Sequence, residues 1–175
     1  VYTHLYDDDG VSQDYLRGRG SWAEGVVGQF PSLTYPSHTS IVTGARPATH
    51  GVVQNTRFSP TGGGSWFFEA ATLKIPTLWD AARDAGLTTG NVHWPVSVGA
   101  RVTWNLPQIW RKGTPDDRKL LSALSTPGLE DTLARVAGAA YADGIDESIE
   151  GDELRGRYAV ALLERMRPGF ATFYF

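Results

Sequence analysis

The sequence contains no cysteine and no long apolar run, and these two absences exclude several classes of protein. Without cysteine the chain forms no disulfide, binds no zinc through thiolates and has no cysteine nucleophile. The absence does not decide between oxidising and reducing compartments. The apolar segment 170–175 is far shorter than the roughly 20 residues that a membrane helix requires, so no membrane span is expected.

The chain also lacks a large excess of charge of either sign: the net charge is -3, and charged residues make up 20% of the chain. The basic residues of segment 111–119 are interrupted by Asp116 and Asp117, so no nucleic-acid-binding patch is predicted. An apolar content of 41% is typical of a globular protein. A length of 175 residues suits one domain better than two.

The two ends of the chain predict a longer parent protein. Position 1 is Val1 rather than Met, the segment 1–6 reads as a strand, and no signal-peptide pattern is present. Segment 170–175 reads as a buried strand, and domains rarely end inside one. We therefore expect a removed leader or a fragment, with residues 1–175 forming a single partial domain.

Hydrophobic periodicity predicts helices that alternate with strands. The clearest helix is 76–86, which places Leu78, Trp79 and Ala82 on one face. The expected helices are 37–43, 76–86, 129–140 and 152–167, and the expected strands are 1–6, 26–30, 87–92 and 170–175. Gly62 to Gly64 mark one flexible loop. This alternation favours a three-layer α/β fold.

The most informative stretch is PSLTYPSHTSIVTG at 31–44, followed by RPATHGVVQN at 46–55. It resembles the nucleophile region of the nucleotide pyrophosphatase/phosphodiesterases of the alkaline phosphatase superfamily. The resemblance extends over 9–175 and implies an incomplete three-layer α/β/α sandwich of the alkaline phosphatase type. It assigns Thr34 as the nucleophile and Asn55 as a donor to the phosphoryl oxygens. Sulfatases are disfavoured because the chain lacks their Cys or Ser motif.

The chemistry that the resemblance implies agrees with the residue types. A hydroxyl is a weak nucleophile near neutral pH, and a bound cation activates it by stabilising the alkoxide. If a helix begins at Ser37, Thr34 and Tyr35 lie directly before its N-terminus, where backbone N–H groups favour an anionic phosphate. Asn55 would donate to an oxygen that gains charge in the transition state.

Several aromatic residues lie near these motifs. The resemblance implies that Tyr35, and more weakly Trp94 in the segment HWPVS at 93–97, bind a nucleobase or another substrate group. The alternative for both residues is an ordinary core or rim position. The other large aromatics of the first half are expected in the core, namely Trp66, Phe67, Phe68 and Trp79.

The resemblance also implies two divalent metal ions, most consistent with zinc. Asp9, which precedes Gly10, matches the first ligand, with Asp8 as the alternative register, and Thr34 would contact the metal. The remaining ligands would lie outside this chain, so the fragment alone is expected to be inactive. The histidines lack a metal-ligand spacing; His38 and His50 are expected to be structural hydrogen-bonders, and His93 is undecided.

Three functions remain open at this point. The first is hydrolysis of phosphodiester or pyrophosphate bonds in small, nucleotide-type substrates, through attack by Thr34. The second is a phosphomonoesterase of the same superfamily, because the same nucleophile and metals serve both reactions. The third is a non-catalytic phosphate- or nucleotide-binding module. A secreted or periplasmic location is implied by the resemblance alone.

Overall fold

The computed structural model describes residues 18–21, 23–109, 116–144 and 147–175. The predicted strand at 1–6 and Asp9 lie outside the described residues. The elements follow in the order α2 (Thr34–Thr43), α3 (Pro47–His50), η1 (Ala70–Thr72), α4 (Leu78–Asp84), β1 (Thr89–Val92), β2 (Trp104–Leu106), α5 (Asp117–Leu124), α6 (Leu129–Ala137), η2 (Tyr141–Gly144), α7 (Ile149–Met166) and β3 (Phe170–Phe173).

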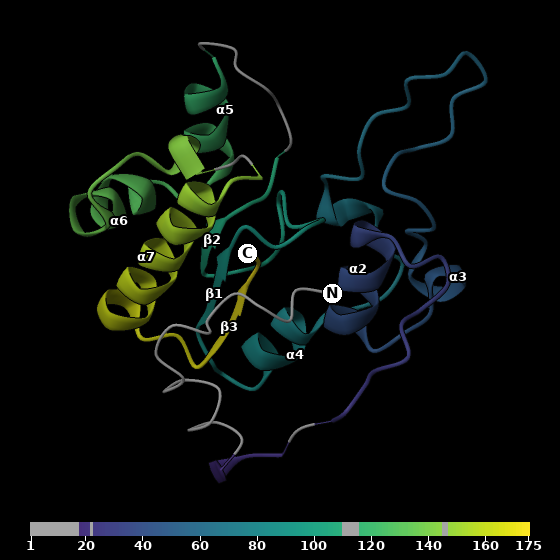
Figure 1. Cartoon of the computed structure of the whole chain (residues 1–175), viewed down its shortest axis with the longest axis horizontal. Helices are drawn as coiled ribbons and strands as arrows, with labels where there is room; N and C mark the ends of the chain where they lie inside the picture. The colour runs from purple at the N-terminus through teal and green to yellow at the C-terminus, as the bar shows by residue number, and fades with distance from the viewer. Residues whose placement is uncertain (1–17, 22, 110–115, 145–146) are drawn as a thin grey trace.

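A three-stranded parallel sheet lies between two layers of helices. Strand β1 is central and pairs with β2 on one side and β3 on the other, in the order β2-β1-β3. Helices α5, α6 and α7 cover one face of the sheet, and α2 and α4 lie on the opposite side (Figure 1). Within the described ranges, no helix combines the length and the apolar composition that crossing a bilayer requires.

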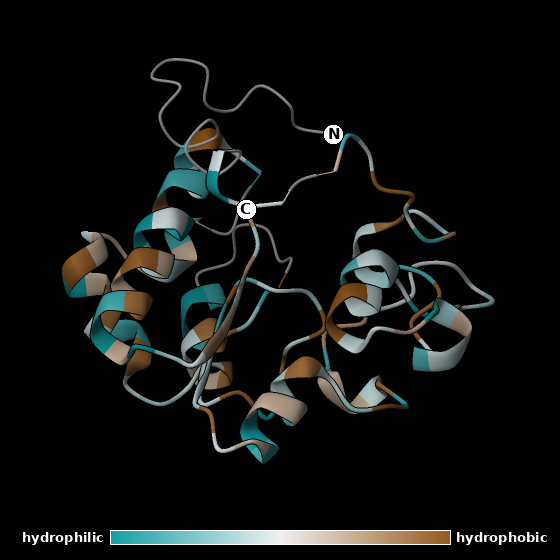
Figure 2. Ribbon diagram, turned by 90° about the horizontal axis from the view of Figure 1, so that it is seen from below, coloured by the Kyte–Doolittle hydropathy of each residue, from teal (hydrophilic) through white to brown (hydrophobic). Residues whose placement is uncertain are grey.

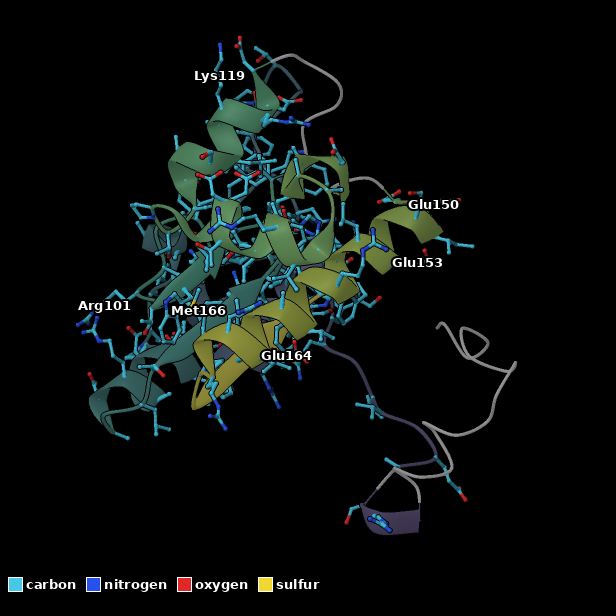
Figure 3. The ribbon with its side chains drawn as sticks, turned by 90° about the vertical axis from the view of Figure 1, so that its left-hand side faces the viewer. Arg101, Lys119, Glu150, Glu153, Glu164 and Met166 are labelled. Carbon is cyan, nitrogen blue, oxygen red and sulfur yellow. The ribbon has the colours of Figure 1, made fainter. Side chains whose placement is uncertain are left out.

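Each face of the sheet has its own hydrophobic core. The larger core joins the sheet to α5, α6 and α7 through buried side chains that include Val92, Leu106, Leu133 and Leu162. A second cluster of Val42, Trp79 and Trp94 joins α2 and α4 to the sheet. Polar and apolar residues alternate around the helices (Figure 2). Helix α7 presents Glu150, Glu153 and Glu164 on its solvent-facing side (Figure 3).

A buried polar network connects the three strands. The amide of Asn91 in β1 donates to Asn105 Oδ1 of β2 at 2.6 Å, and the Thr172 hydroxyl of β3 donates to Asn91 Oδ1 at 3.3 Å. The indole N–H of Trp79 in α4 donates to the Thr172 hydroxyl at 3.1 Å. Because a buried polar group without a partner costs free energy, these bonds allow polar residues in the interior strands.

The structure confirms most of the predicted elements and corrects two of them. Segment 26–30 forms no strand, and Val27 is 96% exposed; no strand among the described residues pairs with this segment. Helix α2 begins at Thr34, not at Ser37. Hydrophobic periodicity predicted neither β2 nor α5. Three-residue β2 is too short to show a period, and its pairing with β1 defines it.

Replacing Gly90 by alanine should destabilise the protein, whereas replacing Gly156 by alanine should stabilise it. A Cβ on Gly90 of β1 would lie 2.7 Å from Leu162 Cδ2 and 3.2 Å from Pro168 Cγ, so Gly90→Ala should lower the free energy of unfolding by about 1–3 kcal/mol. Gly156 in α7 has open space around its Cα, so Gly156→Ala should raise stability by up to about 1 kcal/mol. Urea unfolding measures both; equal effects would contradict the Gly90 packing.

Candidate active site

Thr34 is the first residue of helix α2 and lies in its first turn. Leu33 is the N-cap residue, with φ -105° and ψ 157°, and it supplies no side-chain cap. Pro36 fits the first turn because the leading N–H groups of a helix have no partner within the helix. The prediction that Thr34 and Tyr35 precede the helix is therefore wrong by one turn, although they remain at its N-terminus.

The helix start offers one free backbone donor rather than several. The Tyr35 N–H is bonded to a side chain, Pro36 has no N–H, and the Ser37 N–H donates to the Leu33 carbonyl at 3.0 Å. The Thr34 N–H remains without an acceptor in the part of the chain that the structure describes. The Thr34 side chain is half-buried, and its hydroxyl bonds to no described residue. Thr34 therefore presents a hydroxyl and an N–H together.

Asn55 lies beside this first turn, as the sequence predicts. Its Oδ1 accepts the Tyr35 N–H at 3.0 Å, and its backbone carbonyl accepts the Phe67 N–H at 3.1 Å. Because Oδ1 is occupied, the orientation of the amide is fixed. The Nδ2 donors have no acceptor among the residues that the structure describes. The structure thus brings together the two predicted catalytic residues and leaves the hydroxyl and N–H of Thr34 and the Nδ2 donors of Asn55 without partners among the described residues.

A compact turn brings the chain back from α2 to Asn55. Gly44 and Gly51 end α2 and α3 with φ of 66° and 90°, a left-handed conformation that glycine adopts readily. His50 is buried between the two helices: its Nδ1 accepts the Val52 N–H at 3.2 Å, so its Nε2–H donates to Ser40 Oγ at 3.1 Å. Burial lowers the His50 pKa. His50 has the structural role expected from the sequence.

His38 connects the first turn of α2 to the carboxyl edge of the sheet. Its Nδ1–H donates to the Thr34 carbonyl at 2.7 Å. Its ring contacts Trp94 and Tyr174 edge-on, with centroid separations of 5.0 and 4.7 Å, and these two residues follow β1 and β3. Burial lowers the His38 pKa, so the ring is neutral near neutral pH. Thr34 therefore lies near the strand ends, where open α/β sheets bind ligands.

The two aromatic residues predicted to bind substrate are both in the core. Tyr35 is fully buried and packs with Val52 and Val96. Trp94 is buried with Val42 and Trp79. Their burial agrees with the core alternative for both residues. Residue type and spacing could not reveal this, because burial depends on segments that pack from elsewhere in the chain.

The described residues do not themselves form a metal centre. No group of three or more His, Asp or Glu side chains comes together among them, and Asp9 lies outside the described ranges. His93, which the sequence left undecided, is buried, and its Nδ1 is 2.8 Å from the Tyr141 hydroxyl. Burial, and then the charge of Arg155, lowers the His93 pKa well below its usual value. The ring is therefore neutral and packs as an interior side chain.

Comparison with known proteins places the chain beside one family. Residues 13–175 match the family described as type I phosphodiesterase/nucleotide pyrophosphatase. The chain is 27% identical over 144 residues to human ectonucleotide pyrophosphatase/phosphodiesterase family member 1, covering 70% of this chain and 16% of that protein. It is 37% identical over 84 residues to an uncharacterized pyrophosphatase/phosphodiesterase of Schizosaccharomyces pombe, covering 41% of this chain and 17% of that protein.

A solved structure shares the fold. Phosphonoacetate hydrolase from Sinorhizobium meliloti superposes with a TM-score of 0.58 at 22% identity, covering 83% of this chain and 35% of that chain. This similarity confirms the predicted fold class, an α/β architecture of the alkaline phosphatase type. The chain spans well under half of the length of each of these proteins.

Proposed function

Because the chain belongs to the type I phosphodiesterase/nucleotide pyrophosphatase family, we propose that the protein of which it forms part hydrolyses phosphodiester or pyrophosphate bonds, with Thr34 as the nucleophile. One observation carries the proposal. The Thr34 hydroxyl, the Thr34 N–H and the Asn55 amide N–H groups lie at the same helix start, and none has a partner among the described residues. Such convergent, unpaired polar groups suit an anionic substrate.

The reaction begins with in-line attack of Thr34 Oγ1 on phosphorus. The new O–P bond forms as the bond to the leaving oxygen breaks, the electron pair departs with that oxygen, and the hydroxyl proton passes to solvent water. Asn55 Nδ2 donates to a non-bridging oxygen, where hydrogen bonds preorganised for the transition state are most effective. Water then cleaves the phosphothreonyl intermediate and regenerates the Thr34 hydroxyl.

Family membership also motivates the proposal of two divalent metal ions, most consistent with zinc, with Asp9 and Thr34 among the ligands. The described residues supply only the Thr34 oxygen, whereas a zinc site needs at least three protein ligands. The described residues alone therefore do not fit a zinc ion. A secreted or periplasmic location is proposed from family membership alone.

The first test compares nitrophenyl phosphodiesters with nitrophenyl phosphate in the full-length protein. Because the chain belongs to a phosphodiesterase family, we expect kcat/KM for a diester to exceed that for the monoester by at least about tenfold, a difference of about 1.4 kcal/mol.

The opposite ratio would favour the phosphomonoesterase. Phosphate binding without turnover of either ester would favour the non-catalytic binding module. Because relatives are named nucleotide pyrophosphatases/phosphodiesterases, nitrophenyl esters of nucleotides are the first diesters to test.

A further inference from the structure

The first turn of helix α2 has no side-chain cap. Leu33, the N-cap residue, forms no cap hydrogen bond, and the turn contains no acidic side chain that would interact favourably with the helix dipole. Uncapped helix ends fray, because their leading backbone groups lack partners within the helix. Thr34 lies in this turn, so the position of its hydroxyl depends on contacts from side chains elsewhere in the structure.

Two side chains supply such contacts. Asn55 Oδ1 accepts the Tyr35 N–H at 3.0 Å, and the His38 imidazole donates from Nδ1 to the Thr34 carbonyl at 2.7 Å. A carbonyl oxygen can only accept, so neutral His38 carries its proton on Nδ1. The bond from His38 acts directly on the backbone of the residue that carries the proposed nucleophile.

The His38 ring is itself held at the ends of two strands. It contacts Trp94 and Tyr174 edge-on, with interplanar angles of 75° and 85°. Trp94 follows β1, Tyr174 follows β3, and these two strands pair in parallel. The Trp94 N–H is bonded in turn to Asn91 Oδ1 at 3.0 Å. The imidazole therefore links the Thr34 backbone to the central sheet.

We propose that His38 is a positioning residue: its Nδ1–H fixes the Thr34 carbonyl and, through it, the direction from which Thr34 Oγ1 approaches phosphorus. The inference rests on the proposed function and adds a residue to it. Displacing a reacting group by about 1 Å costs up to about 10²-fold in rate. Because His38 contacts backbone rather than substrate, its loss should lower kcat and leave KM nearly unchanged.

The variants His38→Leu and His38→Asn form a matched pair, because the two introduced side chains have the same branched shape and only asparagine carries an N–H donor. In the full-length protein, His38→Leu should lower kcat for a nitrophenyl phosphodiester by at least about tenfold, with KM within about threefold of the wild type. His38→Asn should recover most of that loss. His38→Phe keeps an aromatic ring without the donor; it should behave as His38→Leu does, and it replaces that variant if leucine prevents folding. Circular dichroism establishes folding.

A matched control lies at the other end of α2. Thr43 Oγ1 donates to the Thr39 carbonyl at 2.6 Å, which is the same four-residue spacing as in the bond from His38 to Thr34. Thr43→Val removes this donor while keeping the branched shape of the side chain. Since Thr43 is the last residue of the helix, the variant should leave kcat at its wild-type value.

The tautomer of His38 provides a readout that does not depend on turnover. Above the histidine pKa, nuclear magnetic resonance of isotope-labelled histidine should show His38 protonated on Nδ1 and His50 on Nε2, since His50 Nδ1 accepts the Val52 N–H. A His38 proton on Nε2 overturns the inference. Equal kcat in folded His38→Asn and a folded donor-free variant also overturns it. Retained turnover in Thr34→Ala would contradict the proposed function instead, so the two failures are distinguishable.

Discussion

Replacing Thr34 with alanine should reduce kcat of the full-length protein by roughly 10⁴-fold or more, a loss of the size seen when a nucleophile is removed from an enzyme that forms a covalent intermediate. The alanine methyl group cannot form the bond to phosphorus. The fold should be unaffected, because the Thr34 hydroxyl bonds to no described residue and alanine is a good residue for a helix start. Turnover of a nitrophenyl phosphodiester measures the loss.

Two companion variants make the Thr34 result specific. Thr34→Ser retains a hydroxyl and should keep measurable turnover. Ser37→Ala removes a hydroxyl one helical turn away and should leave kcat within a few-fold of the wild type, because the side chain of Ser37 makes no described contact with Thr34 or Asn55. Near-normal turnover in folded Thr34→Ala would remove Thr34 from the mechanism, whatever the behaviour of the other two variants.

Asn55→Asp should reduce kcat by roughly 10²–10³-fold, the loss caused by removing one donor that stabilises developing charge in comparable sites. Aspartate retains an oxygen that accepts the Tyr35 N–H, so the bond that positions the side chain survives. It replaces the Nδ2 donor with a carboxylate oxygen, which repels the phosphoryl group. The measurement is kcat for a nitrophenyl phosphodiester, together with a thermal melt.

Asn55→Ala provides the comparison that separates stability from catalysis. It removes both the acceptor and the donor, so the Tyr35 N–H loses its partner, and the unfolding free energy should fall by about 1–3 kcal/mol. Asn55→Asp should melt near the wild-type temperature, whereas Asn55→Ala should melt earlier. If Asn55→Asp keeps full activity, Asn55 acts only as a positioning residue for α2.

The sequence predicted those parts of the candidate site and the fold that a short motif or a local pattern carries. The family resemblance of segments 31–44 and 46–55 predicted Thr34 and Asn55 as site residues; the structure places Asn55 beside the first turn of α2, and their catalytic roles stay a prediction. His50 was predicted as a structural hydrogen-bonder because no metal-ligand spacing surrounds it, and its two ring nitrogens confirm that role. Helix 76–86 was readable from its period, and its observed capping box of Thr77 and Asp80 is also a local signal.

The tertiary structure alone decided which residues are buried and which strands pair. The polar strand residue Asn91 is stable in the interior because β2 and β3 supply partners for its amide, and segment 26–30 has no strand partner among the described residues. Tyr35 is buried by residues that include Trp66, which lies 31 positions further along the chain. The free energy of burial and of strand pairing comes from contacts between distant segments, and a local pattern in the sequence does not contain that information.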